Sequence, residues 1–278
     1  MEKYGIELPP YSVLMSVYDG EDPEFFRQSV DSMLRQTYLT DDFVLVCDGP
    51  LTEELEEIVR EYEENYDFFR PVRLEYKAGT GGCANAGLAR CRNEYVVKMD
   101  SDDIALSKRC ELSMYTLAKH PEVDMLGAYI KEFDSETGKE IAIKKTPTNN
   151  EAIRKYAKRR NPFNNQTLVY KKSFVDKIGG YSTVRRCEDY EFVVRMLAAG
   201  AVGKNIPKVL VRYRVTPGNY DRRRNWANTK SFIGVRWKIH RSGYSSLVDF
   251  IIPSAAQLVM FLLPGSLTGA IYKKLLRK

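Results

Sequence analysis

Tyr95-Val-Val-Lys-Met-Asp-Ser-Asp-Asp103 joins a short, mostly apolar run directly to three carboxylates. The run predicts a buried strand, because short apolar runs bounded by turn residues are typical of sheet cores. Three similar runs precede it, at 11–18, 43–47 and 72–76. The four runs together predict neighbouring strands of one sheet, and the acids mark where the last of these strands ends.

Helical patterns fill the intervals between these strands. Pro23 opens one over 24–36, and Thr52 begins another with the capping signature of a helix start. The glycine-rich stretch Gly79-Thr-Gly-Gly-Cys-Ala-Asn-Ala-Gly87 predicts a loop that runs into a third helix. It lacks the dinucleotide-binding fingerprint and the P-loop lysine, so it is either a close approach to a phosphate or sugar or a tight packing turn. The alternation predicts a doubly wound, mostly parallel α/β sheet.

Polar side chains stand where each predicted strand ends. Ligands of such sheets bind outside the carboxyl ends of the strands, so we expect these side chains to lie at a ligand-binding site. They are Tyr18, Glu21, Asp48, Asn85, Asp100 and Asp102. Any single acid is equally well a solvated turn residue. The cluster, whose members would repel one another, instead indicates Mg²⁺ or Mn²⁺, with waters and a diphosphate completing the coordination.

A second group of acids, Cys187-Glu-Asp-Tyr-Glu191, precedes an apolar helical pattern. Acids in a first helical turn interact favourably with the helix dipole, and that is the ordinary interpretation. A carboxylate at a helix entry that faces a cleft is also a good general base. The polar stretch Asn161-Pro-Phe-Asn-Asn-Gln-Thr167 lies upstream and favours the second interpretation.

These motifs, in this order, resemble the family 2 glycosyltransferases with a GT-A fold, particularly bacterial exopolysaccharide, capsule and O-antigen enzymes. The resemblance covers about Tyr11–Tyr213, most of the chain. Its elements are Leu14–Tyr18, Val46–Gly49, Asn85 with Gly87, Asp100-Ser-Asp102, Asn161–Asn164, Gly179-Gly-Tyr181 and Glu188-Asp189-Tyr190. A single D-x-D is common, whereas seven elements in the family's order are specific.

The resemblance implies a role for several of these residues. Tyr18 and Asp48 would bind the nucleoside base, Asp100 would face the ribose or diphosphate, and Asp102, with Asp100, would hold the metal. Two positions depart from the family pattern. Ala84 replaces an arginine that many members carry, which puts some diphosphate contacts in doubt. Asn165 stands where a histidine is frequent, so no catalytic role is expected there.

The same resemblance implies the reaction. Asp189 would be the catalytic base, with Glu188 in support, and an acceptor hydroxyl would attack the sugar of a nucleotide-diphosphate donor, a UDP-sugar by expectation. The product would be inverted at the anomeric carbon. No covalent nucleophile is needed, and the chain has no Ser-His or Cys-His constellation. The expected acceptor is a polyprenyl-diphosphate-linked or other saccharide in surface polysaccharide biosynthesis.

The charge is distributed unevenly along the chain. The net charge of +6 divides into −7 before Lys204 and +13 from there to the end. We therefore expect a GT-A catalytic domain over 1–225, with a nucleotide-binding half (11–103) and an acceptor half (104–225). A basic amphipathic region over 226–278 would follow. Within 213–224, Arg214 and Arg222 either clamp the diphosphate or face lipid, and the sequence leaves both possibilities open.

The expected fold is accordingly a doubly wound mixed α/β sheet of GT-A type with a basic, helical, membrane-associating extension. The apolar stretch 247–263 is interrupted by Asp249, Pro253 and Gln257, so it is too broken to span a bilayer. It either packs on the core or lies in the plane of an anionic membrane.

The rest of the sequence indicates where the protein works. No secretory signal begins the chain, and the five cysteines form no C-x-x-C pair. Reduced thiols and a peripheral position on the cytoplasmic face of the membrane are expected. A catalytically silent membrane-bound scaffold and a basic nucleic-acid-binding protein are the alternatives. The second lacks a recognisable reader motif, and the acidic body would repel a phosphate backbone, so no nucleic-acid partner is expected.

Overall fold

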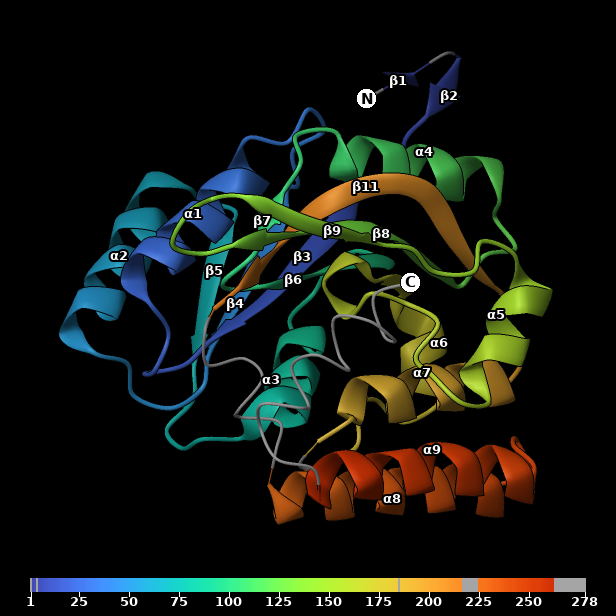
Figure 1. The fold of residues 1–278 in the computed structure, drawn as a ribbon. Helices are drawn as coiled ribbons and strands as arrows, with labels where there is room; N and C mark the ends of the chain where they lie inside the picture. Colours follow the sequence, from blue (N-terminus) through green and yellow to red (C-terminus); the bar gives the residue numbers. More distant parts are fainter. Residues whose placement is uncertain (1, 4, 185, 217–224, 263–278) are drawn as a thin grey trace.

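A nine-stranded mixed sheet, flanked by helices on both faces, forms the body of the molecule (Figure 1). It is seen in a computed structural model that describes residues 2–3, 5–184, 186–216 and 225–262. The strands are β1 (Glu2–Lys3), β2 (Ile6–Glu7), β3 (Tyr11–Val17), β4 (Asp42–Cys47), β5 (Phe69–Arg73), β6 (Tyr95–Asp100), β7 (Ile104–Ala105), β8 (Met125–Asp134), β9 (Glu140–Lys144), β10 (Val169–Lys171) and β11 (Gly203–Val215). β1 and β2 pair only with each other.

The helices are α1 (Pro23–Leu34), α2 (Glu53–Asn65), α3 (Gly79–Leu88), α4 (Arg109–Lys119), α5 (Asn150–Ala157), α6 (Lys172–Lys177), α7 (Glu188–Ala198), α8 (Trp226–Arg241) and α9 (Leu247–Leu262), with a 3-10 turn at Asn165–Thr167. One core layer packs α1, α2 and α4 on the sheet through Phe26, Leu55 and Met114. The opposite layer includes α3, α7 and α8. Side chains alternate between the two layers along β3, as a sheet covered on both faces requires.

The parallel half of the sheet has the order β5-β4-β3-β6. Asp22 caps α1 by accepting from the N–H groups of Glu24 and Phe25, and Thr52 caps α2. Both helix starts therefore agree with the sequence prediction. Because the strands are parallel, Val17 and Cys47 end side by side, and the polar residues that follow them share one edge of the sheet.

Two predicted elements of this half are corrected. The third strand runs over Phe69–Arg73 rather than 72–76, because Phe69 packs on Phe43 in the core. Pro71 is tolerated there, since β5 is an edge strand. The glycine-rich stretch is helical from Gly79 and forms α3 itself. A Cβ at Gly87 would lie 2.2 Å from Leu14 Cδ1, so its glycine lets the helix approach the sheet, as in the packing interpretation.

The other half of the sheet is mixed in direction. β10 is antiparallel to both β6 and β8, β11 is parallel to β8, and β7 and β9 pair antiparallel with β11 and β8. The sheet thus continues across both expected halves of the catalytic domain. α8 and α9 pack together as a further layer beneath α7 (Figure 1).

Candidate active site

The turn after β6 carries the D-x-D acids and rests on Arg214 of β11. The Arg214 N–H donates to Asp103 Oδ1 at 2.8 Å, and its Nε donates to the Asp102 carbonyl at 2.7 Å. Its guanidinium lies 3.9 Å from the Phe25 ring centroid and the residue is buried. Arg214 thus supports this turn, and its expected contact with the diphosphate stays a prediction. Arg222 lies outside the described residues.

Three carboxylates gather above this support. The pKa of Asp102 is raised to about 7, chiefly by burial and also by the charges of Asp100 and Glu21. Glu21 also accepts a hydrogen bond from Ser101 Oγ at 2.5 Å. An acid with a raised pKa beside two like charges is a site where a cation would relieve repulsion. In the described part of the chain, however, no group of three or more acidic, cysteine or histidine side chains is arranged to hold a metal by itself.

Lys98 joins the D-x-D turn to the start of α7, a role that the sequence analysis missed. Its ammonium pairs with the Asp100 carboxylate, and the residue is only 8% exposed. Burial and the neighbouring Asp189 raise the pKa of Glu188, whereas Lys98 lowers it. Lys98 therefore acts electrostatically on both acidic groups. The sequence did contain a signal for this role: Lys98 lies inside an apolar run, and a buried ammonium group requires a charged or polar partner.

Asp189 lies in the first turn of α7, half-buried, and its Oδ2 accepts from Asn161 Nδ2 at 2.9 Å. The residue that precedes this turn, Cys187, has φ of 63°, the one positive φ among the described non-glycine residues. Strain of this kind concentrates at functional sites. Burial above all raises the pKa of Tyr181, with further contributions from Tyr170 and then from Asp189 and Asp100.

Asn85 has a different environment from the one expected. Its Nδ2 donates to the Tyr181 carbonyl at 2.9 Å, and its Oδ1 accepts from the Tyr181 N–H at 2.7 Å. Both groups of the amide are thus bound to backbone. Asn85 ties α3 to the segment that leads into α7, and its expected contact with the nucleotide stays a prediction.

Tyr18 and Asp48 occupy neighbouring strand ends, as predicted. The Asp48 N–H donates to the Val17 carbonyl at 2.8 Å. Asp48 Oδ1 accepts from the N–H groups of Ala78 and Gly79, at 2.6 and 3.2 Å, and so holds the start of α3. The Tyr18 ring is 40% exposed at the same edge. An exposed aromatic ring beside a fixed carboxylate can stack on a base and accept from its N–H groups.

A mixed sheet with acids at its strand ends and a second acid pair at a helix entry defines the GT-A class of glycosyltransferase. Solved structures share the architecture. TarS 1–349 of S. aureus has a TM-score of 0.66 and 16% identity, covering 96% of this chain and 75% of that one. The same protein in complex with UDP-GlcNAc has a TM-score of 0.66 and 17% identity, covering 91% of this chain and 71% of that one. Structural similarity at such low sequence identity shows that the two proteins share a fold.

Residues 12–186 match the family model of Glycosyl transferase family 2, and the chain belongs to that family. Two relatives are similar over most of their length. The UDP-Gal:alpha-D-GlcNAc-diphosphoundecaprenol beta-1,3-galactosyltransferase of Escherichia coli is 34% identical over 272 residues, covering 98% of each chain. The amylovoran biosynthesis glycosyltransferase AmsE of Erwinia amylovora is 38% identical over 221 residues, covering 80% of this chain and 82% of that one. The resemblance and the GT-A expectation are confirmed.

Proposed function

We propose that this glycosyltransferase moves a sugar from a UDP-sugar to a hydroxyl of a lipid-linked saccharide, with inversion, in bacterial surface polysaccharide biosynthesis. The observation that carries the proposal is the meeting of two acidic groups at Lys98: Asp100 pairs with the ammonium, and the ammonium lowers the pKa of Glu188, next to Asp189. This link supports a donor site and a base at one edge of the sheet. The activity named for the E. coli relative supports the substrate classes.

Donor binding is assigned to the strand ends. Tyr18 would stack on the base, and Asp48 would accept from it. The raised pKa of Asp102 and the nearby Asp100 and Glu21 carboxylates fit a divalent cation whose remaining ligands are waters and the donor diphosphate. When bound, such an ion would neutralise charge on the leaving diphosphate.

The base is assigned to Asp189. The acceptor oxygen forms a bond to the sugar C1 as the bond from C1 to the diphosphate oxygen breaks. Asp189 takes the hydroxyl proton, and the nucleoside diphosphate leaves with the bonding electron pair. Asn161, at 2.9 Å, would hold the carboxylate in place, and attack opposite the leaving group gives inversion.

The protein is proposed to work peripherally at the cytoplasmic face of the membrane, held by α9. The polar side chains of this helix face the protein, and its apolar side chains face outward. Asp249 pairs with Arg159 at 2.6 Å, and Gln257 donates to Thr229, so polar groups face the protein. The outward side chains are apolar, among them Leu247, Val248, Ile251, Ile252, Leu258, Val259 and Leu262. In the described residues, no helix is long and apolar enough to cross a membrane. An in-plane position suits such a surface.

Transfer to a synthetic GlcNAc-diphosphate-lipid tests this proposal. A panel of nucleotide sugars is offered with Mn²⁺ to the full-length protein, and the anomeric configuration of the product is read by NMR. One UDP-sugar should be transferred with inversion. Asp189→Asn should lower turnover about 10²–10⁴-fold with donor affinity retained. Asp176→Asn, at an exposed acid of α6, is the matched control. A retained configuration, or an Asp189→Asn variant that turns over normally, would contradict the mechanism.

A further inference from the structure

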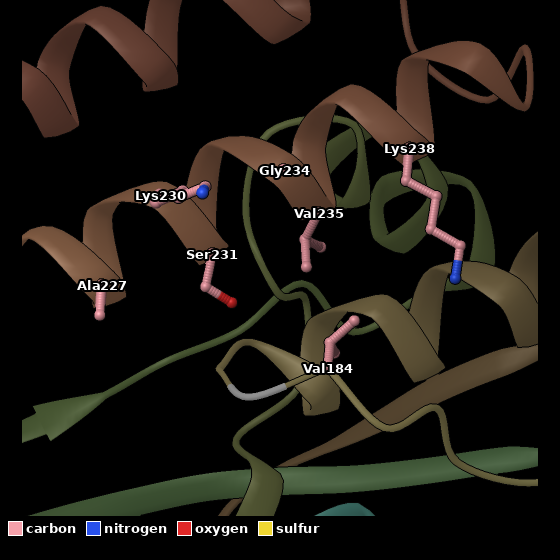
Figure 2. Close-up of a pocket in the computed structure, with 7 residues that line it drawn as sticks. All are labelled: Val184, Ala227, Lys230, Ser231, Gly234, Val235 and Lys238. Atoms are coloured by element: carbon pink, nitrogen blue, oxygen red, sulfur yellow. The ribbon is translucent and has the colours of Figure 1, made fainter.

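A groove of about 370 Å³ lies between α8 and the segment that leads into α7 (Figure 2). Its volume is within the ~300–1,000 Å³ typical of small-molecule sites. The lining is mainly apolar: Val184 forms one wall, and Ala227, Gly234 and Val235 lie on the other. Figure 2 shows Val235 pointing from α8 toward Val184. A Cβ at Gly234 would meet no atom within 4 Å, so the groove is open there.

Hydrogen bonds link one wall of this groove, α8, to the segment that leads into α7. Ser231 Oγ donates to the Arg186 carbonyl at 3.0 Å, and Arg186 Nε donates to Asn228 Oδ1 at 3.1 Å. About two turns further along α8, Lys238 pairs with the buried Glu191 at 2.7 Å. Arg186 lies three residues before Asp189, the proposed base. A molecule that lay along α8 would therefore contact the segment that carries the proposed base.

The two lysines of the groove differ in their chemistry. Lys238 is bound to Glu191, whereas Lys230 is exposed at the rim and meets no carboxylate among the described residues. An apolar strip beside an available ammonium matches a molecule with a hydrocarbon chain and a phosphate. A free saccharide would leave the apolar lining uncovered, and a lipid tail alone would leave the ammonium unused.

We propose that this groove binds the phosphate end of the acceptor's lipid carrier, with the first isoprenoid carbons on Val184, Gly234 and Val235 and the diphosphate near Lys230. The inference rests on the proposed function, since it assigns a subsite to the lipid-linked acceptor. It also gives α8 a role that membrane attachment through α9 does not require. The two helices pack together, so a lipid surface met by α9 would lie beside the groove.

Direct binding tests the subsite without depending on turnover. Farnesyl diphosphate is titrated into the full-length protein with UDP and Mn²⁺ present in excess, so that the donor site is occupied. Inorganic diphosphate and farnesol serve as partial ligands. Gly234→Leu fills the groove and favours the helix, so folding is expected to be retained. It should weaken farnesyl diphosphate binding at least ~10-fold, in keeping with loss of a well-packed apolar contact.

Charge variants complete the experiment. Lys230→Gln should weaken farnesyl diphosphate and leave farnesol unchanged, whereas Arg241→Gln, at the exposed end of the same helix, should change neither. Tight binding of inorganic diphosphate alone would mean a simple anion site and would overturn the proposal. Farnesyl diphosphate affinity that is equal in wild type and Gly234→Leu would also overturn it. Neither result would touch the transfer reaction, so the two proposals fail separately.

Discussion

Asn85 and Tyr181 are joined through both polar groups of one side-chain amide, although they lie 96 residues apart in sequence. The bond pair connects α3 of the parallel half to the segment that leads into α7. It also explains why the glycine pair precedes Tyr181. Gly180 has φ of 74°, and a Cβ there would lie 2.5 Å from Asn85 Oδ1, so only glycine lets the amide reach the backbone. Two motifs are thus one structural unit.

Asn85→Ala should therefore destabilise the fold. It leaves a Tyr181 N–H and carbonyl without their partner, which costs about 1–3 kcal/mol for each such buried group. Urea unfolding measures the change. Asn65→Ala, at an exposed asparagine that bonds only its own helix, should cost less than about 0.5 kcal/mol. An Asn85→Ala protein with wild-type stability and weakened UDP binding would instead support the nucleotide contact that the sequence suggests.

The sequence was informative where local pattern decides structure. The runs at Tyr11 and Tyr95 became parallel strands because their apolar residues are buried on both faces. Asp22 and Thr52 capped their helices because capping is local. Hydrogen bonds between residues far apart in the chain could not be predicted from the sequence. The hydrogen bonds from Arg214 to Asp102 and Asp103 join residues more than 100 positions apart, and no sequence spacing predicts them. Local acid patterns predict the candidate site, whereas the residues that support it are seen only in the folded structure.

Asp102→Asn is expected to give a stability change that depends on pH. The pKa of Asp102 is raised to about 7 in the folded protein from 3.8, so its protonated form favours folding. The destabilisation it causes is absent near pH 4, grows as pH rises, and is complete above pH 7. In EDTA at pH 8, the variant should be more stable than wild type by roughly 1–3 kcal/mol, because each pKa unit is worth ~1.4 kcal/mol and the neighbouring acids share the shift.

The same variant should lose metal-dependent UDP binding. Wild-type affinity for UDP in Mn²⁺ should rise between pH 6 and pH 8 as Asp102 becomes ionised, and the variant should show no such rise. Thermal unfolding and UDP titration at pH 5 and 8, with and without Mn²⁺, measure both effects. Mn²⁺ dependence that survives in Asp102→Asn would remove this carboxylate from the proposed metal site.

Lys98→Met tests the link between the two acidic groups. Methionine keeps the length and apolar stem of the side chain but removes the charge that lowers the pKa of Glu188. The pKa of Glu188 should then rise further, and the acidic limb of the turnover profile should move to higher pH. Turnover should fall several-fold at pH 6 and less at pH 8. Lys131→Met, at a surface lysine paired with Glu140, is the control. A profile that keeps its position would limit Lys98 to a structural role.

The outward face of α9 gives the last prediction. Ile251 and Val259 are 50% and 55% exposed on a helix whose polar residues turn inward. Replacing both with glutamate should release the full-length protein from anionic vesicles, because two charges would enter the hydrocarbon boundary and repel the lipid headgroups. The exposed cations of α8 add roughly 1 kcal/mol each near such a surface, so attachment should weaken in salt without disappearing.

Co-sedimentation with phosphatidylglycerol vesicles measures this release, and UDP binding confirms that the variant is folded. Ile143→Glu on β9 removes an exposed isoleucine from another surface and should sediment like wild type. A second copy of the chain is the other occupant that could cover an apolar face of this size. Light scattering separates the two, because a wild-type dimer that ignores vesicles and becomes monomeric in the Ile251→Glu, Val259→Glu protein would assign α9 to self-association and end the membrane proposal.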